Sequence, residues 1–308
     1  MRIGAGRPRT VSTLACVVAL AGLGLTFTST GSATYGKGNG LLGFQASPKG
    51  CALGARAADF DDCDFPDIAT AKSNGSGGKK VVGSGAQPSF SPSGQSLAFV
   101  EEGLGPGDCF SDETLIAIAP SGGGAPKQVT KCKDGLNEEA PSFSPRGTRI
   151  AFESVPSFAV EGSIVSTTLT GAAPAVLAAD GSQPSWGSNG RIAFVRGGHI
   201  WTMKGDGSDQ IRVTKSKAAD FSPDWSPGAS RIVFARNGEV YTMSPDGKSL
   251  RRLTNNGTSE GDPVWAPDGN RIAFAVRRRR IDVMKPDGKG RTKNVVRNGR
   301  QPAWQPKQ

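Results

Sequence analysis

The chain has 308 residues, a length that fits one large domain or two smaller ones, and it contains 43 glycines and 21 prolines. Its formal charge is +10 at pH 7, from 37 lysines and arginines against 27 aspartates and glutamates. The basic residues are not clustered with aromatic ones, so the charge favours acidic partners only weakly and excludes a typical nucleic-acid-binding protein.

The N-terminus has the pattern of an export signal. Three arginines lie among the first nine residues, an apolar stretch runs from Val11 to Phe27, and small residues end at Ala33. We therefore expect cleavage of residues 1–33, a linker over 34–39, and a secreted or periplasmic, envelope-associated mature chain without a stable membrane span. The alternative is an uncleaved anchor, although the apolar run is shorter than the ~20 residues of a span.

The mature chain is organised by a repeat, whose clearest copy is DPVWAPDGNRIAF at residues 262–274. The aromatic anchors of its copies are Phe90, Phe143, Trp186, Trp225, Trp265 and Trp304, which lie 53, 43, 39, 40 and 39 residues apart. A period near forty residues that holds several short strands is typical of the blade of a β-propeller.

Within one copy, the residue types predict strands. Pro263 lacks a backbone donor, so we expect it on the edge strand that lines the central channel. The turn at Gly269 leads into a second strand, in which Ile272 and Phe274 share one face and Ala273 lies on the other. The small side chain of Ala273 lets neighbouring sheets approach closely. A third strand, an Asp-Gly turn and a fourth strand follow.

The repeat predicts an all-β domain over residues 40–306, a six-bladed β-propeller with four-stranded blades. Residues 40–44 match a second strand without a first, and residues 301–306 match a first strand without a second. Blade 1 is therefore predicted to combine 40–82 with 301–306, so that both termini close the ring. The other blades are predicted at 87–130, 140–178, 183–215, 222–254 and 262–296.

The cysteines predict two disulfides. Cys16 precedes most of the apolar run of the leader, so we do not expect lipidation. The four others in an exported chain allow three pairings. We favour Cys51 with Cys63, which share an insertion, and Cys109 with Cys132, which lie in connections that open on the same face. A metal site is the competing interpretation, but the chain has no CxxC pair and no second histidine.

Three patterns that resemble chemical motifs lie in the wrong context. Residues 257–261 spell GxSxG, but within an inter-blade loop and without a following helix. Residues 38–43 spell GxGxxG but lead into a strand. His199, the only histidine, opens a third strand where other repeats have Glu239 and Arg280. We therefore expect no enzyme active site and no organic cofactor.

An acidic run is the best candidate for a cation site. Its members are Asp59, Asp61, Asp62, Asp64 and Asp67. Calcium binds several carboxylate and carbonyl oxygens of a flexible loop, and a disulfide could hold this one. The spacing matches no calcium motif, and a solvated loop is the alternative interpretation.

The candidate ligand-binding residues gather on one face of the predicted disc. Loops that enter the first strands carry Glu138, Glu139, Asp180, Asp220, Glu260 and Asp262, and a hairpin of blade 6 carries Arg277, Arg278, Arg279 and Arg280. We expect these charges to be exposed around the channel mouth, to contribute little to folding, and to form a binding surface. The alternative is that they only solvate the loops.

The pattern P-x-W-S-P-D-G-x-x-I-A-F, followed by I-x-x-M and an Asp-Gly turn, resembles the TolB-like family of propellers with WD-repeat-like blades. We expect no counterpart of the additional N-terminal domain of the name-giving member, because only a few residues separate the predicted leader from blade 1. The resemblance implies six blades, export and binding of other proteins, although similar blades occur in peptidases and polysaccharide-active proteins. We therefore expect a monomeric, non-enzymatic binding or scaffold module for a protein or cell-envelope ligand. The alternative is a polysaccharide lyase or hydrolase, or a glycan-binding protein.

Overall fold

The computed structural model describes residues 39–46, 66–102, 113–131, 135–157, 159, 162–172 and 174–306. The predicted signal peptide, most of the linker, the four cysteines of the predicted disulfides and all of the acidic run except Asp67 lie outside these residues. In the part of the chain that the structure describes, no helix is long and apolar enough to cross a membrane.

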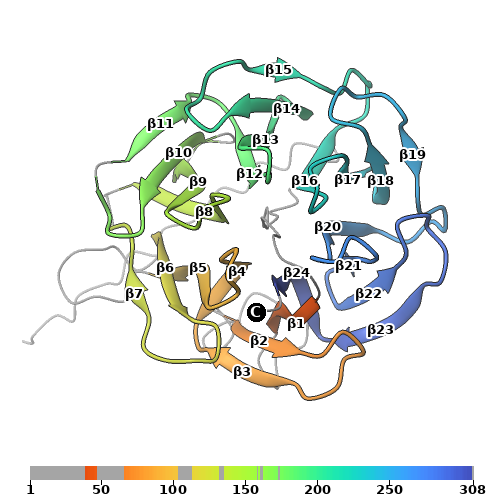
Figure 1. Ribbon diagram of the computed structural model, residues 1–308, viewed down its shortest axis with the longest axis horizontal. Coiled ribbons are helices and arrows are strands. Elements are labelled where there is room, and N and C mark those ends of the chain that lie inside the picture. The colour runs from red at the N-terminus through yellow and green to blue at the C-terminus, as the bar shows by residue number, and fades with distance from the viewer. Residues whose placement is uncertain are drawn as a thin grey trace, which may run out of the picture.

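Six four-stranded antiparallel sheets form a ring, which confirms the predicted six-bladed β-propeller (Figure 1). From the inside outward, the strands are β24 (Gly299–Pro306), β1 (Asn39–Ala46), β2 (Asp67–Ala71) and β3 (Lys79–Val82) in blade 1; β4 (Gly85–Phe90), β5 (Ser96–Glu102), β6 (Thr114–Pro120) and β7 (Lys127–Gln128) in blade 2; β8 (Leu136–Phe143), β9 (Arg149–Pro156), β10 (Ser163–Thr168) and β11 (Ala175–Ala178) in blade 3. They continue as β12 (Ser182–Trp186), β13 (Arg191–Arg196), β14 (His199–Lys204) and β15 (Ile211–Arg212) in blade 4; β16 (Asp220–Trp225), β17 (Ile232–Arg236), β18 (Glu239–Met243) and β19 (Arg251–Arg252) in blade 5; β20 (Glu260–Trp265), β21 (Ile272–Val276), β22 (Arg280–Met284) and β23 (Thr292–Arg297) in blade 6.

Every innermost strand contains a bulge at the residue before its proline. The strand register shifts at this point in all six blades. The residues concerned are Gln87, Ala140, Gln183, Ser222, Asp262 and Gln301, all with φ between 49° and 55°. A left-handed residue followed by a proline, which has no N–H, interrupts the ladder. Some of these side chains reach the next blade: Gln183 Oε1 accepts the N–H of Ser222 at 2.8 Å.

Among the described residues, the hydrophobic core consists of six clusters, each made by two neighbouring blades. Ile272 and Phe274 pack against Val233 of blade 5, whereas Ala273 belongs to the cluster that contains Trp304 of blade 1. The predicted alternation of faces along this strand is therefore confirmed. All three strand residues are fully buried, so the small alanine makes room for the large indole of the adjoining sheet.

The last strand closes the ring, as predicted. β24 pairs with β1, and the two lie side by side in Figure 1. Trp304 is fully buried, with the guanidinium carbon of Arg271 lying 5.3 Å from its ring centroid. Gln305 Nε2 donates to the carbonyl of Gly94 at 2.8 Å, and its Oε1 accepts the N–H of Leu41 at 3.2 Å. The end of the chain thus bonds to blade 2 as well as to blade 1.

The two faces of the ring differ in their connections. One face carries tight turns, between first and second strands and between third and fourth strands; we call it the turn face. At Gly247 the φ is +79°, and an added Cβ would lie 2.6 Å from the carbonyl oxygen of Val213 in the preceding blade. Only glycine fits this approach. The opposite face, the loop face, carries the inter-blade loops and the hairpins between second and third strands.

Candidate functional site

On the loop face, each inter-blade loop lies against a hairpin of a blade. The N–H of Glu260 donates to the carbonyl of Gly238 at 2.8 Å, and the N–H of Arg277 donates to the carbonyl of Ser259 at 2.7 Å. These backbone bonds hold the start of each inner strand beside the connection between second and third strands. The predicted acidic residues and the arginine hairpin are therefore on the same face of the ring.

Most of the predicted acidic ring is buried. Exposed fractions are 4% for Glu138, 0% for Asp220, 0% for Glu260 and 4% for Asp262. Glu139 is half-buried, and the side chain of Asp180 is 59% exposed. The expectation that these acids are exposed is therefore wrong for the four buried residues. The reason is that all four belong to strands β8, β16 and β20, which begin beneath the loop face.

The same ion pair occurs in blades 4 and 5 at different depths. Asp220 forms two hydrogen bonds with Arg236, from Nε at 2.5 Å and from Nη2 at 2.9 Å. Arg196 donates from Nη2 to the carboxylate of Asp180 at 2.8 Å and from Nε to its carbonyl at 3.0 Å. Arg236 also lies over the ring of Phe234, 5.2 Å from its centroid. Sequence reasoning assigned the two aspartates to ligand binding, whereas the structure gives each an arginine from the second strand of its own blade.

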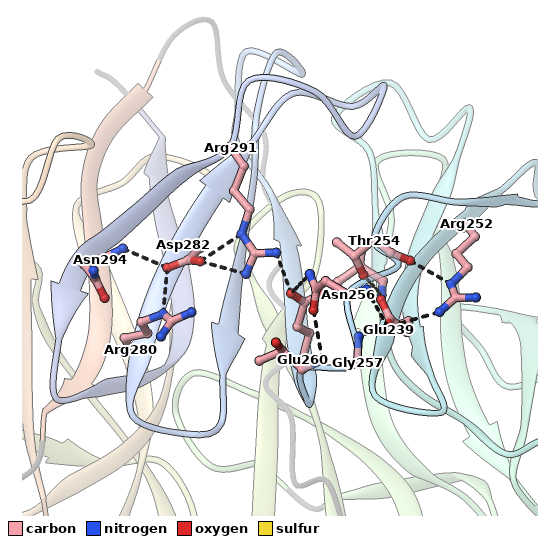
Figure 2. Close-up of polar contacts among 12 residues, drawn as sticks. Glu239, Arg252, Thr254, Asn256, Gly257, Glu260, Arg280, Asp282, Arg291 and Asn294 are labelled. Carbon is pink, nitrogen blue, oxygen red and sulfur yellow. Dashed lines mark hydrogen bonds and ion pairs between the residues drawn. The ribbon is translucent and has the colours of Figure 1, made fainter.

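A chain of polar contacts links blades 5 and 6, and we call it the polar belt (Figure 2). Glu239 Oε1 accepts the N–H groups of Asn256 at 3.2 Å and Gly257 at 3.3 Å, and pairs with Arg252 at 3.1 Å. The amide of Asn256 donates to Glu260 Oε1 at 2.9 Å. These bonds fix the inter-blade loop between β19 and β20.

The polar belt continues through Arg291 into blade 6 (Figure 2). Arg291 bridges two buried carboxylates, with Nη1 2.7 Å from Glu260 Oε1 and Nη2 2.8 Å from Asp282 Oδ2. Asp282 Oδ1 also accepts a hydrogen bond from Arg280 Nε at 3.2 Å and from the N–H of Asn294 at 2.8 Å. Of the four predicted hairpin arginines, Arg280 is thus held by the blade, whereas Arg277, Arg278 and Arg279 are exposed.

The buried carboxyl of Asp262 interacts with two positively charged side chains, Arg278 and Arg300. Burial raises the pKa of this carboxyl to about 6. The charge of Arg278, a hydrogen bond from Ser222 Oγ at 3.3 Å and the charge of Arg300 each lower the pKa and only partly offset this effect. Burial, and then the charge of Arg278, lower the pKa of Arg300. Arg278 and Asp262 therefore interact electrostatically on the loop face. Arg300 was missed, although it precedes its proline by two residues, as Glu139 does in blade 3.

Asp224 is a buried carboxyl that the sequence did not single out. Burial raises its pKa well above the usual range, although the N–H of Trp265 donates to it at 2.8 Å and Ser185 Oγ at 3.2 Å. These donors belong to blades 6 and 4, so one side chain of blade 5 links three blades.

The other chemical motifs do not form a site in the described residues. His199 begins β14 opposite Arg196, and the GxSxG segment ends inside β20 with no helix after it. Asp67, the described member of the candidate calcium loop, is 2.7 Å from Lys80 Nζ. Within the described ranges, no group of three or more histidine, cysteine or acidic side chains is arranged to hold a metal ion.

The turn face has a groove of about 450 Å³ between blades 3 and 4. Its lining includes Arg146, Arg149, Trp186 and Asn189. Arg149 is engaged within the protein, because its Nη2 donates to Ser166 Oγ at 2.7 Å. This groove is the competing location for a ligand.

No protein-family model matches the sequence, and no curated protein is similar to it. Its fold resembles that of TolB from Acinetobacter baumannii, with a TM-score of 0.68 at 20% identity over 87% of this chain and 67% of that chain. A chain of a nidogen/laminin complex gives 0.65 at 12% identity, over 86% and 98%. Oligogalacturonate lyase in complex with manganese gives 0.52 at 13% identity, over 75% and 71%. The chain therefore has the six-bladed β-propeller fold of TolB-like proteins.

Proposed function

We propose that the protein is an extracytoplasmic, non-catalytic module that binds a protein or cell-envelope ligand through its loop face. The observation that carries this proposal is the asymmetry of the ring. The turn face consists of short, similar turns, whereas the loop-face connections differ in length from blade to blade and include the exposed side chains of Arg277, Arg278 and Arg279. Loops held by a rigid scaffold commonly carry recognition.

The loop face is also preorganised. The polar belt fixes the loop before β20, and the backbone bond from Arg277 to Ser259 ties the arginine hairpin to that loop. A surface that is already ordered loses less conformational entropy when a ligand binds. Blades 5 and 6 are therefore the part of this face best suited to recognition.

The structural neighbours are compatible with this function, and they also supply its competitor. One is a chain of a nidogen/laminin complex, and another is an oligogalacturonate lyase. The residue that favours an enzyme is Asp262, whose raised pKa of about 6 is a feature of many catalytic carboxylates. The second candidate function is therefore a polysaccharide-active enzyme with Asp262 as its proton-transfer group.

A steric block on each face tests the proposal. Ser259→Cys on the loop face and Asn270→Cys on the turn face change exposed, uncharged positions. Each is coupled to a bulky maleimide and compared with wild type for capture of the ligand from the cell-envelope and medium fractions of the source cells. We expect the block at Ser259 to abolish capture and the block at Asn270 to leave it unchanged. The reverse result contradicts the proposal and points to the turn-face groove.

A glycan panel tests the enzyme alternative. The pure protein is incubated with neutral and acidic polysaccharides, and products are measured by mass spectrometry. We expect no cleavage. Cleavage by the wild type that disappears in Asp262→Asn would establish the enzyme and contradict a non-catalytic role.

A further inference from the structure

The hairpin between β21 and β22 has a sequence that does not suit its backbone. The two turn residues with positive φ are Gly197 and Gly198 in blade 4 (55° and 71°), Asn237 and Gly238 in blade 5 (50° and 71°), and Arg277 and Arg278 in blade 6 (50° and 51°). A turn with two left-handed residues normally uses glycine or asparagine, because other side chains are strained there. Blade 6 alone among these three places two arginines in this strained turn.

Like charges are also crowded around this hairpin. Arg280 and Arg297 are directly opposite one another on β22 and β23, a placement that destabilises a sheet when the charges have the same sign. Arg300 is the second residue of β24, which packs against β20, β21 and β22 of blade 6, and the positive charge of Arg278 acts on this partly buried side chain. The hairpin and the strand ends beside it thus carry six arginines: Arg277, Arg278 and Arg279 in the turn, Arg280 at the start of β22, Arg297 at the end of β23 and Arg300 near the start of β24.

The carboxylates of this region are directed inward. Glu260 and Asp282 are fully buried and are bonded to Arg291, and Asp282 also bonds Arg280. Asp262 is 4% exposed. A ligand on the loop face therefore meets the exposed guanidinium groups before it meets any of these acids.

Folding alone would favour glycine or asparagine at the two positive-φ positions, which are the residues that blades 4 and 5 have in their turns. The turn of blade 6 is also one residue longer, because Val276 pairs with Arg280 whereas Arg236 pairs with Glu239. An oxyanion explains the arginines at these positions, because guanidinium groups bind carboxylate and phosphate oxygens through paired, charge-assisted hydrogen bonds. Strain at an exposed turn is the kind of cost that is retained at binding sites.

We propose that Arg277, Arg278 and Arg300 form an oxyanion-binding site at the loop-face end of blade 6, for a ligand that bears carboxylate or phosphate groups. The site rests on the proposed function and specifies its ligand chemistry. Asp262 lies beneath the site as the buried counter-charge of Arg278 and Arg300.

The test uses two polyanions as probes, polygalacturonate for carboxylate and linear polyphosphate for phosphate, with neutral dextran as a blank. The main variant is Arg277→Asn with Arg278→Gly, which places residues suited to a positive φ at both positions and keeps the length of the turn. We expect its affinity for the bound polyanion to fall about tenfold or more, the effect of losing charge-assisted hydrogen bonds. Its melting temperature rises or stays the same, because the turn strain is removed. Arg300→Gln lowers affinity by a similar factor.

A matched control separates the site from general attraction. Arg251→Gln with Lys293→Gln removes the same number of positive charges from exposed positions on β19 and β23. We expect this control to bind within about twofold of wild type, as for solvent-screened charges away from a contact. Binding of only one probe identifies the anionic group. Binding of neither probe, an unchanged affinity in the hairpin variant, or an equal loss in the control overturns the proposal.

The polyanion test of the oxyanion site and the maleimide test of the proposed function can fail independently of each other. If the probes fail to bind but the maleimide at Ser259 still blocks ligand capture, the loop face remains the binding surface and only the oxyanion site is wrong. If the probes bind at the hairpin but the Ser259 block has no effect on capture, the oxyanion site exists and the proposed function is wrong.

Discussion

Replacing Asp220 with asparagine measures how much a buried acid of the loop face stabilises the fold. Asp220 is fully buried and is bonded twice to Arg236, whose side chain is 11% exposed. Asparagine keeps the size of the side chain but leaves the guanidinium group without its counter-charge. Removing one partner of a buried ion pair costs about 3–5 kcal/mol.

Asp180→Asn is the matched control. It removes the aspartate that pairs with Arg196, the blade 4 counterpart of Arg236, and the side chain of this aspartate is 59% exposed. Exposed pairs contribute about 0–1 kcal/mol, because water and salt screen them. The two substitutions are chemically identical and differ in depth.

Urea unfolding and thermal melting, followed by tryptophan fluorescence, give the two free energies. For a domain of this size a loss of 1 kcal/mol lowers the melting temperature by about 2–4 °C. We therefore expect a fall of about 10 °C for Asp220→Asn and only a few degrees for Asp180→Asn. Equal shifts in the two variants would refute the reasoning, because burial would then not determine the strength of the pair.

Three further predictions concern closure, the turn face and pH. Deleting residues 301–308 removes the inner strand of blade 1 and the fully buried Trp304, so we expect the whole domain to lose at least about 3–5 kcal/mol; melting like the full chain would contradict closure by both termini. Gly247→Ala should lower the free energy of unfolding, measured with denaturant, by about 1–3 kcal/mol, because its φ is +79° and the added Cβ would strike a carbonyl oxygen. Gly228→Ala is the control and should leave the free energy of unfolding unchanged, because the added Cβ would have no atom within 4 Å. The pKa of Asp262 is about 6 in the folded protein and 3.8 ordinarily. Between these two pH values the folded protein binds a proton that the unfolded chain does not, so the free energy of unfolding rises as the pH falls from about 6 to 3.8. Asp262→Asn should remove up to about 3 kcal/mol of this dependence, and parallel pH profiles of the two proteins would show the assignment to be wrong.

The blades could be predicted because their signal is local and repeated. A proline before an aromatic anchor, a glycine turn and an alternating strand are each set by residues a few positions apart. Closure followed from the same pattern, since residues 40–44 lacked a first strand and residues 301–306 lacked a second. Trp304 then took the place of the other anchors in the structure.

The burial of the acidic side chains on the loop face could not be predicted from the residues next to them in the sequence. Asp220 looks like a loop residue until Arg236, 16 positions later, is brought opposite it by the hairpin. The same spacing joins Asp180 to Arg196, so the recurrence of an aspartate and an arginine 16 residues apart was a usable signal. For Glu260 the partner is Arg291 on the far side of blade 6, and no spacing within a repeat indicates that contact.

Hydrogen–deuterium exchange, with and without the captured ligand, tests most directly the claim that the loop face is the binding surface. The account predicts slower exchange in peptides that cover residues 255–262 and 276–280, and no change over the turn-face segments 244–250 and 266–271. Protection confined to the turn-face segments, with the arginine hairpin exchanging at its free rate, would contradict it.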